Sequence, residues 1–539
     1  MTSPTPAAPS AAGGARILAV DVGTTGTRAM LFDLEGRPHG MAYREYRSHF
    51  LTPSVIDHDP QTWLDAVDAA VPEVLRSTAT PGEAIVAIAV TSQRATILPV
   101  DAAGQPLSPA ILWQDKRTLE QCRQIEATVG PQEVYARTGL RIDPYFSLPK
   151  LLWFRQVRPE VYRQAHRFLT VHDFVVHHLT GEFVTEWTQA SRTMLFQVDH
   201  FRWDEELAGR LGIDIERMPR ALPPGSVAGT LTRQAAERLG LPASVPVVMA
   251  GGDQQCAALG LGVTRPGLAK VTTGTGSFVV APVNRPYRDP QARVLCSASA
   301  VAGGWILEAG IFTSGSVYRW VRDELSVAET TAGATLGLDP YDLLNLEAAR
   351  AAPGAGGLVV IPHFAGSAAP YWNPLARGVI FNLALGHRRA DLIRAVLEGI
   401  ALEVGKNLAI IEALVEAGDA GSGLREIRVS GGAVRSDLFN QIQADVYGRR
   451  VVPGKLEQAT ALGAAILAAA AVGAYPDVQT AAGAMSTVDP SRAREPDLRR
   501  HAIYQEIAAL HDAVYRALAD AGVYERAAAV ARLLQELGG

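Results

Sequence analysis

Three short glycine turns in the sequence carry residue types that bind phosphate. They span residues 21–28, 271–278 and 430–436, and each follows an apolar run of strand length. Glycine lets the backbone approach a ligand closely and turn its N–H groups toward it. Threonine hydroxyls, which are frequent in the first two turns, add neutral donors for phosphate oxygens. Two such turns facing each other would hold a polyphosphate, although each turn alone is also compatible with an ordinary hairpin.

Charged residues at the first turn fit the same chemistry. Asp21 ends the strand before this turn, and Arg28 stands where the chain leaves it. A carboxylate supplies the oxygen ligands that Mg²⁺ prefers, and a guanidinium neutralises phosphate charge. The first turn therefore predicts a magnesium-linked phosphate site.

A second carboxylate, Asp253, lies in a Gly-Gly-Asp-Gln-Gln segment directly after the apolar run 245–250. A carboxylate at a strand end can accept a proton from a substrate hydroxyl. Its ordinary pKa of about 3.9 makes it a weak base for an alcohol. This is tolerable in phosphoryl transfer, where positioning dominates the rate. The alternative is that Asp253 only caps the helix that follows.

Other common fingerprints are absent from the sequence. It contains no GxxxxGK[ST] loop, no GxGxxG between a strand and a helix, and no GxSxG nucleophile turn. His172, His177 and His178 are spaced five and six residues apart, so they do not share one helix face for a metal ion. We expect these histidines to be structural.

The turns require a frame of alternating strands and helices. Apolar runs at 84–92 and 245–250 indicate strands buried on both faces of a sheet. Helices are expected at 59–76, 391–408 and 436–447, the last one capped by its serine. This alternation is typical of the α/β class. The likeness between the first two turns is a weak internal repeat, which indicates two related domains that meet near residue 260.

Composition narrows the function classes. The chain has 539 residues, of which 48% are hydrophobic and 19% charged, so large cores are available and global disorder is excluded. Its 50 Lys and Arg against 55 Asp and Glu leave a net charge of −5, which argues against nucleic acid as a partner.

Cysteine content and apolar runs predict the compartment. Cys122, Cys256 and Cys296 are too scattered for a disulfide framework or a zinc site, which predicts a reducing, cytoplasmic compartment. Residues 1–14 are a poor signal peptide and are expected to be a disordered leader. The Ala-rich run 459–475 is too short to cross a membrane and predicts a buried helix.

From about Arg16 to about Tyr475 the chain resembles the FGGY carbohydrate kinases, which belong to the actin/hexokinase-like ATPase superfamily. The resemblance rests on a dozen segments in order rather than on one glycine loop. These segments are AVDVGTTGTRAMLFD, IDHDPQTW, TSQRATILPVD, AILWQDKRT, RTGLRIDPYFSLPKLLW, TEWTQASRTMLF, GGDQQCAALG, TTGTGSF, HFAGSAAPYWNPLARGVIFNL, LIRAVLEGIALE, SGGAVRSDLFNQIQADVYG and EQATALGAAILA.

The resemblance implies an α/β fold of two actin/hexokinase-like (ribonuclease H-like) domains with an interdomain cleft. Closure of such a cleft would exclude water, which competes as phosphoryl acceptor. The expected organisation is a leader at 1–14, an N-terminal sugar-side domain with the first phosphate loop at 15–260, a C-terminal nucleotide-side domain at 261–485, and C-terminal helices at 486–539.

The resemblance also assigns roles by position, with ATP and Mg²⁺ as cofactors. Asp253 corresponds to the catalytic base and Asp21 to the Mg-linked aspartate. The expected ATP-binding residues are Thr24, Thr25 and Arg28 in the first loop, Gly274, Thr275 and Gly276 in the second, and Gly315, Gly432 and Ser436 on the nucleotide side.

Within the family the glycerol kinases are similar around the acceptor. The matching substrate-binding residues are Arg94, Trp113, Tyr145, Asp253 and Gln254. Ala95, however, replaces the glutamate that follows the arginine, which removes a hydroxyl acceptor and leaves more room. Arg319 and Ser436 also stand where glycerol kinases have Gln and Asn.

These departures favour a longer ketopentose such as xylulose or ribulose, with glycerol as the alternative. Xylulokinases usually carry Met–His in the region of Gln93 and Arg94, and this chain does not. An actin- or chaperone-like ATPase without a sugar substrate is the alternative of another class, and a retired sugar sensor is a third. We expect a small-molecule acceptor, no nucleic acid and no membrane, with a homodimer implied by resemblance alone.

Overall fold

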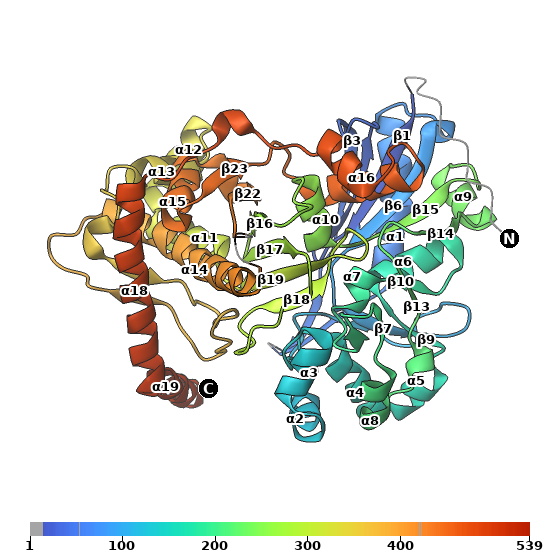
Figure 1. Cartoon of the computed structure of the whole chain (residues 1–539), viewed down its shortest axis with the longest axis horizontal. Helices are drawn as coiled ribbons and strands as arrows, with labels where there is room; N and C mark the ends of the chain where they lie inside the picture. The colour runs from blue at the N-terminus through green and yellow to red at the C-terminus, as the bar shows by residue number, and fades with distance from the viewer. Residues whose placement is uncertain (1–13, 53, 420, 422, 539) are drawn as a thin grey trace. The chain divides into compact units, whose positions relative to one another are not determined.

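The computed structural model describes residues 14–538 except 53, 420 and 422. Apart from Gly14, the expected leader lies outside the described residues. The chain divides into two compact units, each discontinuous in sequence (Figure 1). Unit 1 comprises 1–265, 282–306 and 458–487, and unit 2 comprises 266–281, 307–457 and 488–539. The sequence analysis placed single cuts near 260 and 485, and these cuts stay predictions.

Unit 1 is built around a mixed six-stranded sheet in which the neighbours of β1 are β2, antiparallel, and β6, parallel. Strand β15 continues the parallel part beside β6. The sheet order is β14 (Val227–Thr230), β15 (Pro246–Gly252), β6 (Ile85–Ser92), β1 (Arg16–Val22), β2 (Gly26–Phe32) and β3 (Pro38–Glu45). The carboxyl ends of β1, β6 and β15 therefore meet at one edge, which is where Asp21, Gln93 and Asp253 lie.

Helices cover both faces of this sheet. Leu18 and Val20 of β1 share one hydrophobic core with residues of α1 (Gln61–Ser77) and α6 (Val171–Thr180). Side chains alternate across a strand, and the opposite face of β1, β6 and β15 packs against α16 (Ala459–Ala471). This explains why the strands read as continuous apolar runs. The Ala-rich run predicted to be a buried helix is α16.

Helix α10 (Asp253–Gly260) packs closely against α16 because glycine stands at both contact points. A Cβ built on Gly463 would lie 1.7 Å from the Cys256 carbonyl oxygen, and one on Gly260 would lie 2.0 Å from that of Ala459. The helix that begins at Asp253 is thus fixed from behind by backbone contact.

A second sheet in unit 1 combines two strands that precede β6 in the chain with three that follow it. Its order is β4 (His49–Thr52), β5 (Val55–His58), β8 (Ala110–Ile111), β7 (Ile97–Val100) and β9 (Arg167–Thr170). Trp113 follows β8, and α4 (Ser147–Val157) begins directly after Phe146.

Unit 2 repeats the hairpin arrangement of unit 1. Its sheet contains β19 (Trp305–Ile311), β17 (Ser277–Val283), β16 (Leu268–Thr273), β22 (Glu426–Ser430) and β23 (Arg450–Pro453) in that order. Strands β16 and β17 form an antiparallel hairpin and β22 pairs with β16 in parallel, as β1, β2 and β6 do in unit 1. The weak internal repeat in the sequence therefore has a counterpart in topology.

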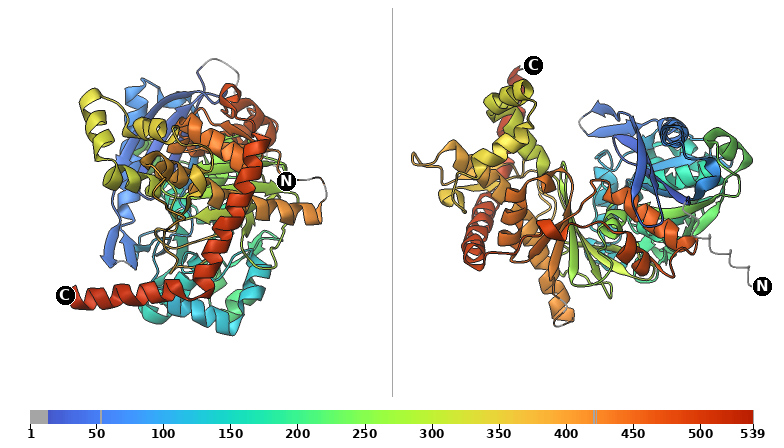
Figure 2. Two further views of the ribbon diagram at one scale, coloured as in Figure 1. Left: turned by 90° about the vertical axis from the view of Figure 1, so that its left-hand side faces the viewer. Right: turned by 90° about the horizontal axis from the view of Figure 1, so that it is seen from above.

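Unit 2 also contains the helices α11 (Gly315–Leu325), α12 (Val327–Leu336), α13 (Pro340–Ala348), α14 (Arg389–Gly418), α15 (Asp437–Tyr447), α18 (Leu498–Asp520) and α19 (Val523–Gly538). The cap predicted for the helix ending at 447 is confirmed, because Ser436 Oγ accepts the Phe439 N–H at 3.2 Å. Helix α14 is longer than predicted because its buried stripe continues through Ile411 and Val415. The two closing helices, α18 and α19, meet at an angle (Figure 2).

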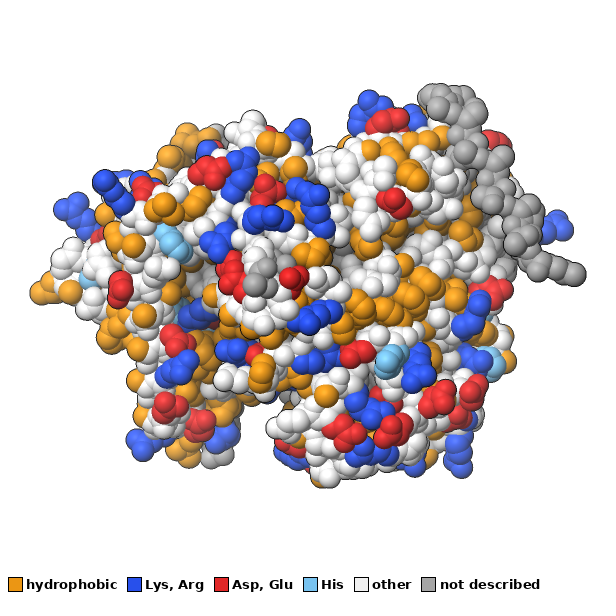
Figure 3. Space-filling view, in the orientation of Figure 1, with side chains coloured by type: hydrophobic (Ala, Val, Ile, Leu, Met, Phe, Trp, Pro, Cys, Tyr) orange, Lys and Arg blue, Asp and Glu red, His pale blue; other side chains and the backbone are white. Residues whose placement is uncertain are grey.

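On the face shown in Figure 3, positive and negative side chains are interspersed, so neither sign of charge dominates that face. Among the residues that the structure describes, no helix is both long enough and apolar enough to span a bilayer.

Candidate active site

Asp253 is the first residue of α10, directly after the end of β15. Its Oδ1 accepts the Gln254 N–H at 2.7 Å, and its Oδ2 accepts the Gln254 side-chain amide at 3.3 Å. A helix N-terminus favours a negative charge. The side chain is still 32% exposed, so the carboxylate is fixed in direction but accessible. The N-cap of α10 is Gly252, with no side-chain cap hydrogen bond, so Asp253 is the first helical residue and not the cap that the alternative required, and its carboxylate keeps a face open to a substrate.

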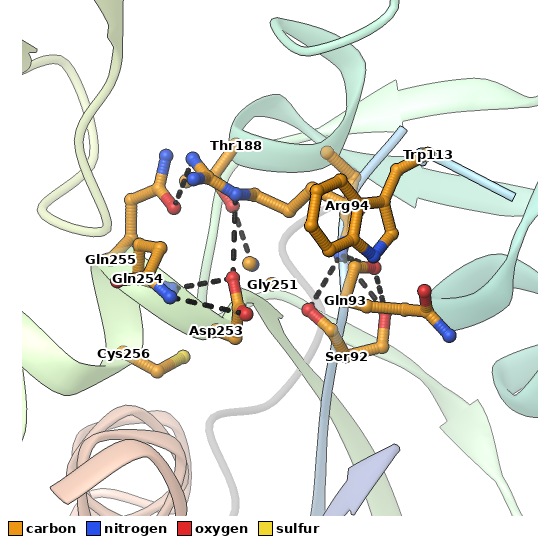
Figure 4. A network of polar contacts seen from close by, with 12 residues as sticks. Ser92, Gln93, Arg94, Trp113, Thr188, Gly251, Asp253, Gln254, Gln255 and Cys256 are labelled. Atoms are coloured by element: carbon orange, nitrogen blue, oxygen red, sulfur yellow. Dashed lines mark hydrogen bonds and ion pairs between the residues drawn. The ribbon is translucent and has the colours of Figure 1, made fainter. Parts of the chain in front are cut away.

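Arg94 pairs with this carboxylate from the segment after β6. Its Nε lies 3.4 Å from Asp253 Oδ1, and its side chain is only 3% exposed. Its guanidinium also donates to Gln255 Oε1 at 3.0 Å. Figure 4 shows the Asp253 carboxylate between the Arg94 and Gln254 side chains. Strands β6 and β15, which are far apart in sequence, thus place Arg94 and Asp253 side by side as an ion pair.

A buried network holds the end of β15 in place. Gly251 adopts φ +96°, a conformation that favours glycine. The Gly252 N–H donates to Thr188 Oγ1 at 2.8 Å, and this hydroxyl donates to Glu186 Oε1 at 2.7 Å. Burial raises the pKa of Glu186. The network fixes the turn that aims Asp253.

The predicted aromatic residues lie together. The Trp113 and Tyr145 rings are 5.3 Å apart, and both side chains are partly exposed. The Trp113 indole N–H donates to Thr24 Oγ1 at 3.0 Å, and Thr24 Oγ1 donates to Gln93 Oε1 at 3.4 Å. The aromatic pair is thereby connected to the first glycine turn.

Asp21 and Arg28 face each other across the β1–β2 hairpin, with 3.9 Å between Asp21 Oδ2 and the guanidinium. Burial raises the pKa of Asp21 to about 7; Arg28 opposes this rise and the negative charge of Asp253 adds to it. Asp21 is therefore a buried carboxylate that also senses the negative charge of Asp253, and carboxylate oxygens are the ligands that a divalent cation such as Mg²⁺ prefers. Thr25, at the tip of the turn, is exposed.

No group of three or more His, Cys, Asp or Glu side chains in the described part of the chain could hold a metal ion. Of the three histidines expected to be structural, His172 is fully buried beside Asp173, His177 stacks on Phe183, and His178 contacts Asp68.

Ala95, the residue that departs from the glycerol-kinase pattern, follows Arg94 with φ +66°. Its side chain has no exposed surface. The extra room expected beside Arg94 is therefore not open space in this structure. What the position lacks is a polar group.

Unit 2 contains a pocket of about 530 Å³. Five of the residues predicted to bind ATP line it, together with Arg319. These are Gly274, Thr275, Gly315, Gly432 and Ser436. Gly276 does not line the pocket; a Cβ there would lie 2.4 Å from the Ile311 carbonyl oxygen, so this glycine serves the packing of the hairpin on β19. Thr24, Thr25 and Arg28 belong to unit 1.

Backbone contacts build the glycine end of this pocket. The Gly274 carbonyl accepts the Gly315 N–H at 2.9 Å, and a Cβ on Gly315 would lie 2.2 Å from that oxygen. The Thr275 carbonyl accepts the N–H groups of Ser314 and Ser316. Gly431, with φ +91°, would place a Cβ 2.3 Å from the Thr273 carbonyl oxygen. Glycine is thus required where α11 and the end of β22 meet the hairpin.

Aromatic and apolar side chains also line the pocket. The Tyr318 and Tyr341 rings are stacked at 5.5 Å, and the Tyr318 hydroxyl donates to Asn345 Oδ1 at 2.9 Å. Leu397 and Ile400 of α14 form an apolar wall. Glycine backbone, stacked tyrosine rings and apolar side chains therefore line one pocket, and such a combination of apolar and polar groups is typical of small-molecule and cofactor sites.

Several of these residues were missed by the sequence analysis. Glu186 and Thr188 stand in the segment TEWTQASRTMLF, where several other polar residues surround them, so nothing local singled them out. Gln255 directly follows two residues that were assigned. Tyr318, Tyr341 and Asn345 come from helices with no motif, so only the fold brings them together.

The two α/β units, each with a mixed sheet and a glycine hairpin, define an actin/hexokinase-like architecture. Comparison with known proteins agrees. Residues 16–260 match the FGGY family of carbohydrate kinases, N-terminal domain, and residues 269–472 match its C-terminal domain. The chain belongs to the FGGY family of carbohydrate kinases, so it is a phosphotransferase, and ATP is implied as its substrate.

The individual relatives are named for different acceptors. The chain is 34% identical over 518 residues to a glycerol kinase from Janthinobacterium sp. (strain Marseille), an alignment that covers 93% of this chain and 99% of the relative. Among solved structures, the xylulose kinase and the gluconate kinase from Lactobacillus acidophilus superpose with TM-scores of 0.85 and 0.86. Both are 25% identical, and each comparison covers 94% of this chain and 98% of the other. Family membership argues against the alternative of an assembly ATPase.

Proposed function

We propose that this kinase transfers the γ-phosphoryl group of ATP to a terminal hydroxyl of a small sugar or polyol, with a ketopentose such as xylulose or ribulose as first choice. The observation that carries the proposal is the Arg94–Asp253 pair at the end of β15. The Arg94 side chain is buried and fixed, whereas the Asp253 side chain keeps about a third of its surface exposed. This is the arrangement needed to orient a hydroxyl and take its proton.

Asp253 acts as the base in this proposal. The acceptor hydroxyl oxygen attacks the γ-phosphorus, the bond from the γ-phosphorus to the β,γ-bridging oxygen of ATP breaks, and the hydroxyl proton passes to an Asp253 carboxylate oxygen. The Gln254 side chain and the Arg94 guanidinium orient the carboxylate and offer donors to other substrate hydroxyls. Trp113 and Tyr145 provide an aromatic surface for the C–H face of the acceptor.

The phosphates are assigned to the glycine hairpins. Thr24, Thr25 and Arg28 contribute hydroxyls and a cation in unit 1. Gly274, Thr275, Gly315, Gly432 and Ser436 belong to the pocket of unit 2, which we assign to the nucleotide. Asp21 would hold Mg²⁺, since its carboxylate lies near the end of β1, beside the first glycine turn, and supplies the oxygen ligands that Mg²⁺ prefers. When bound, Mg²⁺ neutralises phosphate charge as the γ-phosphoryl group is transferred. A cytoplasmic location and a homodimer stay predictions.

The preference for a ketopentose rests on Ala95. Buried polar groups discriminate strongly between substrates that do and do not satisfy them. A chain that lacks the carboxylate beside Arg94 loses one hydroxyl acceptor, and a longer acceptor can replace that contact with others. Glycerol is the second candidate, favoured by the identity to glycerol kinases and by the matching Arg94, Trp113, Tyr145 and Gln254.

The test is ADP release with Mg-ATP against glycerol, erythritol, D-xylulose, D- and L-ribulose, and L-rhamnulose. Strong stimulation by one ketopentose, with little from glycerol, supports the first choice. Strong glycerol turnover refutes the ketopentose assignment and leaves the kinase assignment in place. Steady ATP hydrolysis that no acceptor stimulates contradicts this set of acceptors. A catalytic-site variant, Asp253→Asn, separates acceptor-dependent turnover from background.

A further inference from the structure

Lys150 of unit 1 is a fully buried lysine, and it has no role in the proposed chemistry. It lies on α4, among the buried residues Leu148, Pro149, Leu151 and Leu152. Burial lowers its pKa to about 7, while the negative charges of Asp115 and Asp143 oppose that change. A buried ammonium costs free energy unless hydrogen bonds compensate. Its hydrogen bonds are therefore informative.

The Lys150 ammonium donates to two backbone carbonyls. Nζ lies 2.9 Å from the Ala95 oxygen and 2.9 Å from the Tyr145 oxygen. Ser147 Oγ donates to the same Ala95 oxygen at 3.2 Å. These two carbonyls are 50 residues apart in the chain and belong to different segments of unit 1. One ammonium thus joins two stretches of backbone, and the Ser147 hydroxyl adds a second, neutral link to one of them.

Both stretches carry acceptor-site residues. Ala95 has φ +66° and directly follows Arg94, so the position of its carbonyl fixes the backbone that carries the guanidinium. Tyr145 contributes the ring that contacts Trp113. A lysine with three donors can hold both carbonyls, whereas an apolar residue of similar length can hold neither.

We propose that Lys150 is a positioning residue that fixes the Arg94 segment relative to Tyr145, and thereby sets the affinity for the acceptor. The proposal rests on the assignment of these residues to the acceptor site in the proposed function. Lys150 does not contact the acceptor, and it has no part in nucleotide binding, which is assigned to other residues. Substitution of Lys150 should therefore weaken the binding of the acceptor and leave the binding of ATP unchanged.

The experiment compares Lys150→Met with the wild type, using whichever acceptor is turned over best. We expect the acceptor KM to rise about tenfold or more, because a small misplacement of orienting groups is costly. The KM for ATP should stay within about twofold. Lys150→Gln keeps a donor and should restore part of the acceptor affinity. Ser147→Ala, which removes only the neutral donor to Ala95, should raise the acceptor KM by about twofold to threefold.

An unchanged acceptor KM in Lys150→Met overturns the proposal. Equal rises in both KM values, or a fall in kcat alone, also overturn it, because a purely structural role would not act on one substrate. Thermal unfolding shows whether Lys150→Met folds; if it does not, Lys150→Gln and Ser147→Ala decide, and unchanged acceptor affinity in both overturns the proposal. A wild-type protein that none of the tested acceptors stimulates contradicts the acceptor assignment on which this proposal rests, and that result is recognised before any variant is made.

Discussion

The two candidate half-sites are built by different means. In unit 1 the reactive group is a side chain held by other side chains, with Asp253 fixed by Arg94 and Gln254, and Arg94 fixed by Gln255. In unit 2 the glycine end of the pocket is made of backbone, and glycine is required because a Cβ on Gly315 would overlap the Gly274 carbonyl. A substitution of a site residue in unit 1 should therefore change the rate or the acceptor specificity. A substitution of a pocket glycine in unit 2 should first displace the backbone that forms the pocket.

The largest effect is expected for Asp253→Asn. The amide keeps the shape of the side chain but cannot accept the hydroxyl proton, so kcat should fall by about 10²–10⁴-fold with a much smaller change in acceptor KM. Acceptor-dependent ADP release measures this. Asp59→Asn is the matched control: Asp59 also accepts a backbone N–H at the start of a helix, from Gln61 at 3.0 Å, but it is exposed and outside the site. Near-normal turnover in Asp253→Asn would rule out its role as base.

Two glycines of the unit 2 pocket test the backbone half of the comparison. Gly315→Ala places a methyl group 2.2 Å from the Gly274 carbonyl oxygen, so the hairpin and α11 must separate. We expect a loss of about 1–3 kcal/mol in the free energy of unfolding and a higher KM for ATP. Calorimetry and ATP titration of initial rates measure the two quantities.

Gly432→Ala is the paired variant, because nothing lies within 4 Å of the Cβ it adds. The free energy of unfolding should stay within about 0.5 kcal/mol of the wild type. If ATP approaches the backbone at Gly432 closely, the KM of the Gly432→Ala variant for ATP should rise without any loss of stability. Equal destabilisation by both substitutions would contradict the view that only Gly315 is required by packing.

The same difference explains what the sequence analysis was able to predict. Glycine turns, strand ends and the Ser436 cap are local, so the hairpins, α15 and the place of Asp253 followed from short segments. The hydrogen bonds between distant segments that hold the site in place could not be predicted in this way. Thr188 reaches Gly252 across 64 residues, and Lys150 reaches Ala95 across 55, through spacings that no periodicity encodes. Tyr318 and Asn345 meet only once α11 and α13 are packed.

A further variant tests what sets the acceptor specificity of unit 1. Ala95→Glu restores a carboxylate after Arg94, and the ratio of kcat/KM for glycerol to that for a ketopentose should rise by about tenfold. Ala95→Gln, which has the same shape without the charge, is the control and should shift the ratio less. The side chain enters a position with no exposed surface, so thermal unfolding is measured alongside. An unchanged ratio in a folded Ala95→Glu protein would mean that Ala95 does not set the acceptor.

The smallest effect concerns pH and compares one buried histidine from each unit. His58 of unit 1 stacks on Trp63 at 4.6 Å, and burial, with a contribution from His49, lowers its pKa to about 4. His511 of unit 2 has its pKa lowered to about 3 by burial and by Lys406. An unfolded histidine takes up a proton below about pH 6.5, while these two stay neutral in the fold. Their contributions to stability are complete above that pH and are lost progressively as the pH falls toward each folded pKa.

Between pH 7.5 and pH 5.5 each histidine should therefore cost about 1 kcal/mol in the free energy of unfolding. His58→Phe keeps an aromatic ring against Trp63 and removes the titration, so the drop in thermal midpoint over this pH range should shrink by about 2–4 °C in the transition of unit 1. His511→Gln should do the same for unit 2 and leave unit 1 unaffected. A pH dependence that neither variant reduces would show that both histidines take up protons in the folded protein, and that their burial is incomplete in solution.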